Sequence, residues 1–284
     1  MTSGTSETTT RMRPRRPRQP RVSIVVPALN EARNLAAVLP TLPAVHEVIL
    51  VDGGSVDGTI ATARRARPDI VTVLQSRRGK GNALAAGFAR VTGDVVVMFD
   101  ADGSADPGEI ERFVEVLKSG ADFAKGSRFT VGGGSGDITP VRRVGNLFLN
   151  GLFKLGFGAR STDLCYGFNA FWADLLPLLA LPDHSHPSLD GRMQWGDGFE
   201  IETVIHCRFA AAGAGIVEVP SVERLRLFGE SSLNAFTDGL RVLRTLFAEW
   251  RRARAQRRSL GPSHRRPREI PLLRDRTYPG KAAA

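Results

Sequence analysis

The chain has 284 residues, of which 42% are hydrophobic and 24% charged, a composition that is ordinary for a soluble globular protein. Its formal net charge of +10 is concentrated at the two ends: residues 1–21 carry +5 and residues 251–284 carry +9, which leaves −4 for residues 22–250. Because the basic charge lies outside the folded body, the composition argues against a protein that binds nucleic acid specifically.

Both ends of the chain are predicted to be disordered. Residues 1–20 are rich in Ser, Thr, Pro and Arg, and residues 256–284 mix Pro, Arg and Gly, so neither segment can bury enough apolar surface to fold. The first also lacks the apolar run of a signal peptide. These basic tails are either solvated ends or arms attracted to an anionic membrane leaflet. We therefore expect the folded domain to span residues 21–255.

Cysteine content and hydropathy indicate where the protein acts. Cys165 and Cys207 fit neither a disulfide framework nor a zinc site, so we expect a protein of the reducing cytoplasm. No apolar stretch reaches the roughly 18 residues of a membrane span, and the best run, residues 169–181, is interrupted by Asp174 and Pro177. We expect the protein not to cross a membrane, although it could lie on the inner face of one.

Apolar runs alternate with helical segments from residue 21 onward. Strands are predicted at 22–29, 47–54, 70–75 and 94–102, with helices near 31–39, 57–66, 80–91 and 107–118. A fifth strand precedes Arg128, followed by a flexible loop at 131–140, helices near 141–155, 199–212 and 232–254, and strands at 166–172 and 215–220. This alternation predicts an α/β fold with a mainly parallel sheet, helices on both faces and ligands at the carboxyl ends of the strands.

Asp100 and Asp102 follow the fourth strand, which is almost wholly apolar. Two carboxylates at this spacing can converge on Mg²⁺ or Mn²⁺ that bridges a diphosphate. The same residues also suit a simple turn before a helix that Asp106 caps. Since the apolar run places both carboxylates at the binding edge of the sheet, we predict a metal site here.

Asp52 ends the second strand, where it could accept hydrogen bonds from a nucleobase or simply close a turn. Arg128 follows the fifth strand and could reach a diphosphate at the same edge. No G-x-G-x-x-G follows the first strand, which excludes the dinucleotide fingerprint.

A basic loop, SRRGKGNA, precedes the third helix. Gly79 and Gly81 flank Lys80 and suit a close approach of the backbone to an anion at the helix start, with Arg77 and Arg78 beside them. Each of these cations alone could simply be exposed to solvent, but their convergence on one edge of the sheet predicts a phosphate-binding loop.

Together these segments resemble the inverting family 2 glycosyltransferases of the GT-A fold. The resemblance rests on VSIVVPALNEARNL (22–35), VDGGSVDGT (51–59), GKGNALAAGF (79–88), FDADGSADP (99–107) and KGSRF (125–129). Within that family the chain is most similar to polyprenyl- or dolichyl-phosphate hexosyltransferases, on RRVGNLFLN (142–150), TDLCYGFNAF (162–171), DGFEIE (197–202) and RLRLFGESSLN (224–234).

The resemblance implies a role for individual residues. The donor nucleotide would be bound by Pro27, Leu29, Glu31, Asp52, Lys80 and Asp100, the metal by Asp100 and Asp102, and the phosphate charge by Arg128. The sugar and the acceptor would be bound by Asp163, Gly167, Asn169, Arg224, Arg226 and Ser231. Ser104 stands where mannosyl members often carry a Gln metal ligand, which leaves the sugar and the metal coordination open.

The implied reaction is metal-dependent transfer of a hexose, with inversion, from a GDP-mannose or UDP-glucose type donor to polyprenyl phosphate. A phosphate monoester has a second pKa of about 6, so it is already an anionic nucleophile at neutral pH. A soluble or glycan hydroxyl acceptor would need a base, for which Asp197 is the first candidate and Glu200 the second. Asp197 also suits the N-cap of the helix near Phe199.

Three other classes of protein share some of these features. A non-catalytic nucleotide-sugar binding module would keep the fold but should have lost part of the Asp and Arg set, all of which is present. A nucleic-acid-binding protein is indicated by the basic tails alone. A nucleotidyltransferase could use the same carboxylates but would release pyrophosphate.

The last predicted helix is amphipathic and allows two interpretations. An apolar stripe recurs at three- and four-residue steps through Leu233, Phe236, Leu240, Leu243, Phe247 and Trp250. Packing against the core explains the stripe most simply, whereas the neighbouring arginines would also suit a helix in a bilayer interface, giving a peripheral membrane contact.

Overall fold

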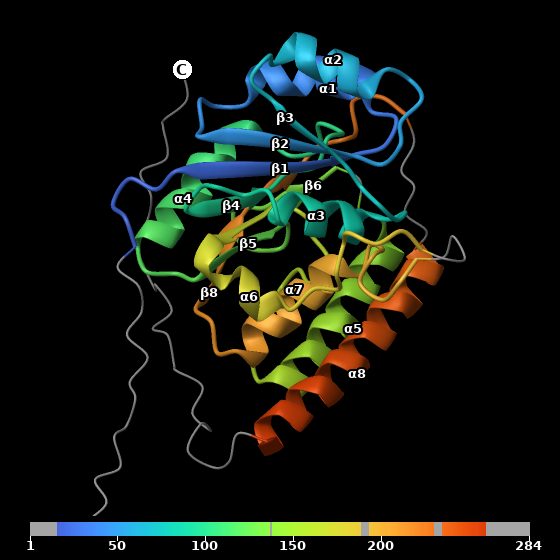
Figure 1. The fold of residues 1–284 in the computed structure, drawn as a ribbon. Helices are drawn as coiled ribbons and strands as arrows, with labels where there is room; N and C mark the ends of the chain where they lie inside the picture. Colours follow the sequence, from blue (N-terminus) through green and yellow to red (C-terminus); the bar gives the residue numbers. More distant parts are fainter. Residues whose placement is uncertain (1–15, 137, 189–192, 230–234, 260–284) are drawn as a thin grey trace, which may run out of the picture.

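A seven-stranded sheet lies at the centre of the part of the chain that the computed structural model describes, residues 16–136, 138–188, 193–229 and 235–259 (Figure 1). Its strands are β1 (Val22–Ala28), β2 (Glu47–Asp52), β3 (Val71–Leu74), β4 (Val95–Met98), β5 (Phe123–Ser127), β7 (Asn169–Trp172) and β8 (Ile216–Pro220). Two short strands, β6 (Gly134–Ser135) and β9 (Val222–Glu223), form a separate pair.

The helices alternate with the strands as predicted for an α/β fold. They are α1 (Ala32–Val38), α2 (Thr59–Ala66), α3 (Lys80–Phe88), α4 (Ile110–Lys118), α5 (Pro140–Phe157), α6 (Leu176–Leu179), α7 (Ile201–Ala211) and α8 (Ala235–Ser259). Short 3₁₀ turns occupy Leu39–Thr41, Pro107–Glu109 and Ala173–Leu175.

The strand order is β3-β2-β1-β4-β7-β5-β8, and only β7 runs antiparallel to its neighbours in this sheet. Asn169, the first residue of β7, pairs with both Met98 of β4 and Lys125 of β5. Because β7 is reversed, its beginning lies at the carboxyl ends of β4 and β5. The residues just before Asn169 are thereby placed at the predicted binding edge.

Alternating side chains of the apolar strands bury both faces of the sheet. Ile24 of β1 joins one core cluster with residues of α1 and α4, whereas its neighbour Val25 joins the cluster on the opposite face with residues of α3 and α7. A third cluster, with Phe153 and Leu246 at its centre, packs α5 and α8 against α7 as an outer layer (Figure 1).

The predicted fold class is confirmed, but several boundaries differ. The fourth strand ends at Met98, so Phe99 and Asp100 lie beyond it and lead into a turn at residues 101–102. The loop predicted at 131–140 contains β6, and the last helix continues to Ser259, four residues beyond the predicted end of the domain. At the other end, Arg16 lies within the predicted tail yet pairs with Asp122 at 2.7 Å.

In the described ranges, no helix combines the length and the apolar character that a membrane span requires.

Candidate active site

The turn after β4 holds the two predicted metal ligands at the surface. Asp102 Oδ1 accepts hydrogen bonds from the backbone N–H (3.0 Å) and the hydroxyl (2.7 Å) of Ser104, which fix its carboxylate. The side chains of Asp100 and Asp102 are 32% and 24% exposed. Asp106 caps the following turn by accepting from the N–H of Gly108, as predicted. The turn therefore presents two oriented, accessible carboxylates.

Lys80 links Asp100 to Glu202, a carboxylate that was not predicted from the sequence as a site residue. Its Nζ lies 2.7 Å from Asp100 Oδ1 and 2.7 Å from Glu202 Oε1. Burial alone would lower the pKa of Lys80, but Asp100 and Glu202 together raise it, so the ammonium stays charged. Glu202 is the one acidic residue within α7, and this is the signal that could have identified it.

Gly167 brings the backbone before β7 against this cluster. A Cβ atom at this position would lie 2.8 Å from Asp100 Oδ2 and 2.9 Å from Lys80 Nζ. The reversed strand β7 thus places a residue without a side chain beside the metal-ligand candidate.

Asp52, the predicted base-reading residue, has one uncommitted oxygen. Its Oδ2 accepts from the N–H groups of Gly54 and Ser55, both at 2.9 Å, whereas Oδ1 is buried without a hydrogen-bond partner in the described part of the chain. Asp52 is only 1% exposed, and a buried unpaired carboxylate oxygen is costly, so a ligand N–H that reaches it would supply the hydrogen bond that the fold leaves unmade. Leu29 is 54% exposed nearby, against Gly53.

The segment 224–228 crosses this edge of the sheet. Arg226 forms ion pairs with Glu31 and, at 3.5 Å, with Asp102 Oδ2. The backbone of Phe228 both donates to and accepts from the side chain of Asn34, at 3.0 and 3.1 Å. Arg226 therefore reaches the carboxylates predicted for the donor, not a separate acceptor site.

Further bonds hold the same segment to the turn after β4. The N–H of Leu227 donates to the carbonyl of Asp102, the N–H of Arg224 donates to that of Ser104, and the Arg224 side chain pairs with Asp106. Ser231, predicted beside these arginines, lies outside the described residues.

The predicted N-cap role of Asp197 is wrong, because α7 begins at Ile201 and Glu200 occupies its N-cap. Asp197 instead accepts two hydrogen bonds from Arg77, at 2.8 and 2.9 Å, with side chains 2% and 1% exposed. The same pairing raises the pKa of Arg77. Arg77 is thus committed to a buried ion pair, and the prediction that it binds a diphosphate is not supported.

The two glycines of the basic loop serve a different purpose from the one predicted. A Cβ atom at Gly79 would lie 2.1 Å from the carbonyl oxygen of Asp197, and one at Gly81 would lie 1.8 Å from that of Gly196. The absence of side chains at Gly79 and Gly81 therefore allows the backbone of residues 196–197 to pack against the start of α3. This is where we predicted that an anion would bind.

Arg128 lies between two carboxylates at the end of β5. It donates to both oxygens of Asp163 (2.7 and 2.9 Å) and to Glu223 (3.0 Å). Burial would lower the pKa of Arg128, but these carboxylates raise it. Asp163 is fully buried in this pair, so it does not line an open sugar site as predicted.

Asn169 is also buried and joins strands. Its amide accepts from the N–H of Gly126 and donates to the carbonyls of Tyr166 and Gly167. It holds the Gly167 backbone in place and does not project into an open site.

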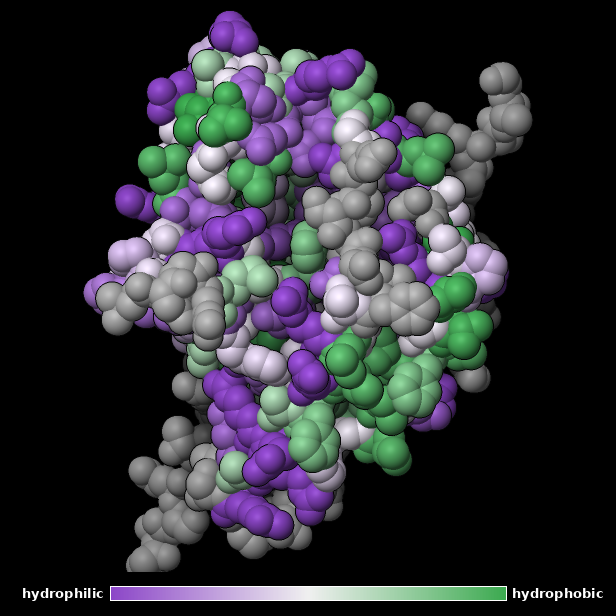
Figure 2. All heavy atoms as spheres, turned by 90° about the vertical axis from the view of Figure 1, so that its right-hand side faces the viewer, coloured by the Kyte–Doolittle hydropathy of each residue, from purple (hydrophilic) through white to green (hydrophobic). Residues whose placement is uncertain are grey.

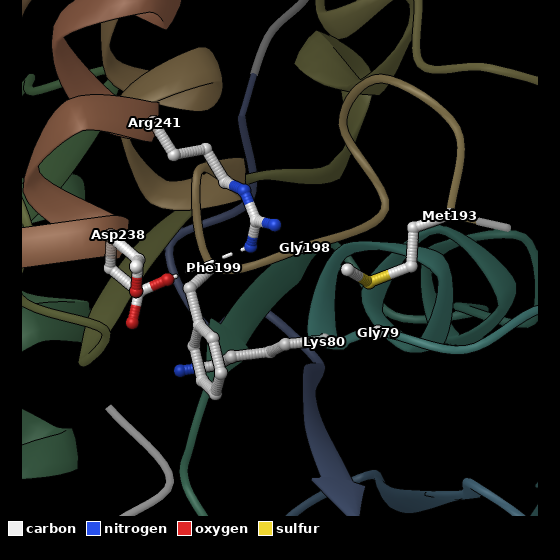
Figure 3. Close-up of a pocket in the computed structure, with 8 residues that line it drawn as sticks. Gly79, Lys80, Met193, Gly198, Phe199, Asp238 and Arg241 are labelled. Carbon is white, nitrogen blue, oxygen red and sulfur yellow. Dashed lines mark ion pairs between the residues drawn. The ribbon is translucent and has the colours of Figure 1, made fainter. Parts of the chain in front are cut away.

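A cavity of about 280 Å³ lies beside Lys80. Figure 3 shows Arg241 and Asp238 entering from α8, Phe199 lying between them and Lys80, and Met193 on the far side near Gly79. Arg241 and Asp238 form an ion pair at 3.6 Å. The cavity gives the Lys80 cluster a second, partly apolar approach.

Fold and site together are those of an α/β transferase with carboxylates at the sheet edge, and comparison with known proteins agrees. Residues 23–175 match the family model described as glycosyl transferase family 2. The chain belongs to that family and is a glycosyltransferase.

Named relatives cover most of the chain. It is 32% identical to polyprenol monophosphomannose synthase of Mycolicibacterium smegmatis over 81% of this chain and 86% of that protein. It is 34% identical to undecaprenyl-phosphate mannosyltransferase of Micrococcus luteus over 83% and 98%, respectively. A shorter match, 40% identical over 112 residues, is to an uncharacterized glycosyltransferase of Mycobacterium tuberculosis. It covers 39% of this chain and 50% of that protein.

Solved structures support the fold. Glucosyl-3-phosphoglycerate synthase from Mycobacterium tuberculosis, in complex with Mn²⁺, uridine diphosphate and phosphoglyceric acid, superposes with a TM-score of 0.62 over 85% of each chain at 22% identity. At this identity the similarity establishes the GT-A fold alone.

Proposed function

We propose that this glycosyltransferase transfers a hexose from a nucleoside diphosphate sugar to polyprenyl phosphate, with inversion and with Mg²⁺ or Mn²⁺. The observation that carries the proposal is the joint placement of Asp100, Asp102 and the unpaired Asp52 oxygen at one edge of the sheet. The names of the two mannosyltransferase relatives above, both of which act on a polyprenyl phosphate, support this acceptor class.

The residues at this edge fit a divalent ion bound together with a diphosphate. Asp100 and Asp102 offer accessible oxygen ligands, and in the described ranges no cluster of three or more His, Cys, Asp or Glu side chains forms a complete protein site. Mg²⁺ and Mn²⁺ in nucleotide sites take one or two carboxylates and complete their shell with phosphate oxygens. The ion would stabilise the charge of the departing nucleoside diphosphate.

The protein's own groups bind and orient the donor. Asp52 Oδ1 accepts an N–H from the base, and Leu29 offers an apolar surface beside it. Lys80 holds Asp100 in one orientation and keeps one of the three negative charges of Asp100, Asp102 and Glu202 neutralised. Arg226 would have to leave Asp102 for a metal and donor to be held there, and its guanidinium would then be free to bind a phosphate.

The buried state of Asp197 favours a phosphate acceptor over a hydroxyl acceptor. A base must reach the proton that it removes, but both Asp197 oxygens are held by Arg77 and only 2% of the side chain is exposed. A phosphate acceptor needs no base, and we assign its binding to Arg224 and to Arg128, which the resemblance had given to the donor phosphate. Glu223 shares Arg128 and is 18% exposed, so an incoming phosphate can replace it.

The test is nucleoside-diphosphate release from GDP-mannose and UDP-glucose with Mn²⁺, with and without a short polyprenyl phosphate. We expect release that requires metal and is stimulated by the lipid, and an anomeric configuration in the product opposite to that of the donor. Asp102→Asn should lower turnover by about 100-fold or more, since it removes charge at the diphosphate. Asp69→Asn, the same change at an exposed surface position, is the matched control.

Two outcomes would contradict the proposal. Release that a soluble glycosyl acceptor stimulates and the lipid phosphate does not would establish the hydroxyl-acceptor alternative. Absence of donor turnover in folded protein, with every metal and acceptor, would show that the proposed reaction is wrong.

A further inference from the structure

Helix α5 carries a second apolar stripe that the core does not use. Its core side consists of Leu149, Phe153 and Phe157 together with two asparagines. The opposite side exposes large apolar residues at helical spacing: Val141, Val144, Leu147, Phe148 and Leu155. Leu155 is 84% exposed and Leu147 is 74% exposed. A helix that is apolar on both sides has a partner surface that the fold itself does not supply.

Helix α8 extends this stripe. Its core side is Val242, Leu246 and Ala253, whereas Leu240 and Phe247 are exposed. Core packing, the simpler interpretation of the sequence stripe, is therefore wrong for these two residues. Leu233 lies outside the described residues, and the side chain of Phe236 is not described.

Helices α5 and α8 pack against each other along one seam. Leu243 and Trp250 are partly buried in the cluster that joins the two helices, and Trp250 lies against Gly156 of α5. Figure 2, which views the side of the molecule where α5 and α8 lie, shows hydrophobic residues gathered over its lower right part. We call the exposed apolar residues of both helices the α5–α8 face.

The two helices that carry this face are strongly cationic. Helix α5 contains no Asp or Glu, and its charged residues are Arg142, Arg143 and Lys154. On α8 the two acidic residues are paired, Asp238 with Arg241 and Glu249 with Arg208. Beyond Phe247 the helix adds a cavity of about 300 Å³ lined by Trp250, Arg251, Arg254, Ala255 and Arg258.

We propose that the α5–α8 face docks on an anionic lipid bilayer, with its apolar side chains in the interface and its arginines at lipid phosphates. A second copy of this chain is a poorer partner, because pairing two such faces would bring cationic rims together. Residues 22–250 have a net charge of −4, so the arginines that α8 adds after residue 250 also set the orientation at the membrane.

The same helix is tied to the acceptor side of the site. Asn146 and Asn150 of α5 both donate to the carbonyl of Thr162 at 2.8 Å, next to the Asp163 that holds Arg128. These asparagines are on the core side of α5, so docking of its opposite side would place the membrane surface across this one helix from Asp163 and Arg128, where the proposed function has the lipid phosphate bind. This role in acceptor entry rests on the proposed function, whereas the docking itself does not.

The test is co-sedimentation with vesicles of phosphatidylcholine alone and of equal parts phosphatidylcholine and phosphatidylglycerol. The full chain should bind the anionic vesicles only. Leu147→Ser with Phe148→Ser should weaken this binding about tenfold or more, because two exposed apolar side chains are lost. Leu74→Ser, which removes an exposed leucine on edge strand β3, is the matched control and should bind as the unchanged protein does.

Activity with a short, water-soluble prenyl phosphate separates this proposal from the proposed function. The double variant should turn over that acceptor as the unchanged protein does, and circular dichroism should show the same fold. Absence of vesicle binding by the unchanged chain, or equal binding by the double variant, would overturn the docking proposal whatever the activity. Dimerisation in ultracentrifugation that the double variant abolishes would assign the face to a second copy instead.

Discussion

Asp197→Asn should lower stability much more than it lowers the rate of the chemical step. The carboxylate compensates the buried Arg77 guanidinium through two hydrogen bonds and also accepts the N–H of Gln194 at 2.8 Å. Removing one partner of a buried ion pair leaves an uncompensated charge and costs about 3–5 kcal/mol. For a domain of this size that corresponds to a melting temperature lower by roughly 6–20 °C.

Urea unfolding followed by circular dichroism measures this change. Asp183→Asn is the control, because the Asp183 side chain is exposed and its backbone carbonyl, which accepts from Arg77, is kept. Its free energy of unfolding should stay within about 0.5 kcal/mol of that of the unchanged protein. The double variant Arg77→Met with Asp197→Leu should be more stable than Asp197→Asn, since no buried charge is left alone. Unchanged stability together with a kcat lower by more than about 100-fold would refute this reasoning and restore Asp197 as a base.

Three further predictions concern single side chains. Asp52→Ala should weaken GDP or UDP binding about 10- to 100-fold in calorimetry, because a hydrogen bond to a charged group contributes about 1.5–3 kcal/mol. Burial, assisted by the nearby Lys125 charge, holds the pKa of His206 well below its usual value, so the unfolded chain binds a proton that the folded chain does not. Stability should therefore fall by up to about 1.4 kcal/mol per pH unit below about pH 6.5, and His206→Leu should remove that slope in urea titrations. Arg226→Ala should raise Mn²⁺ affinity about two- to fivefold in electron paramagnetic resonance titrations, since it removes a competing, partly exposed ion pair.

Each of these has an outcome that would contradict it. Equal nucleotide affinity in Asp52→Ala would mean that its free oxygen does not contact the base. A pH slope that persists in His206→Leu would assign the acid sensitivity to another group. Equal or weaker Mn²⁺ binding by Arg226→Ala, with Arg224→Ala as the comparison, would show that Arg226 does not compete for Asp102.

The parallel half of the fold was predictable because its signals are local. The apolar run before Asp100 and the turn residues after Asp52 each mark a strand end, and parallel strands bring such ends to one edge. The pairs Arg77–Asp197 and Lys80–Glu202 join residues more than 100 positions apart, so no local pattern announces them. For the same reason the local sequence around Gly79 and Gly81 predicted an anion site, whereas both glycines pack against the distant backbone of residues 196–197.

Amphipathic periodicity was informative about α8 but did not determine which side of the helix is buried. The stripe through Leu240 and Phe247 and the stripe through Val242 and Leu246 are both apolar, and only contact with α5 and α7 separates them. On α5, too, which side is core follows from tertiary packing and not from spacing.

The insertion of β7 between β4 and β5 has a consequence for how the protein folds. Strands β1–β4 and their helices are joined by short connections and can form early, whereas β7 must close loops of about 70 residues to β4 and about 40 to β5 before it pairs with either. Refolding should therefore pass through a species in which the Asp52 and Asp100 strands are already protected from hydrogen exchange while Gly167 and its neighbours are not. In such a species the sheet edge that we propose binds the nucleotide would form before the segment around Gly167, and nucleotide added during refolding would stabilise that species.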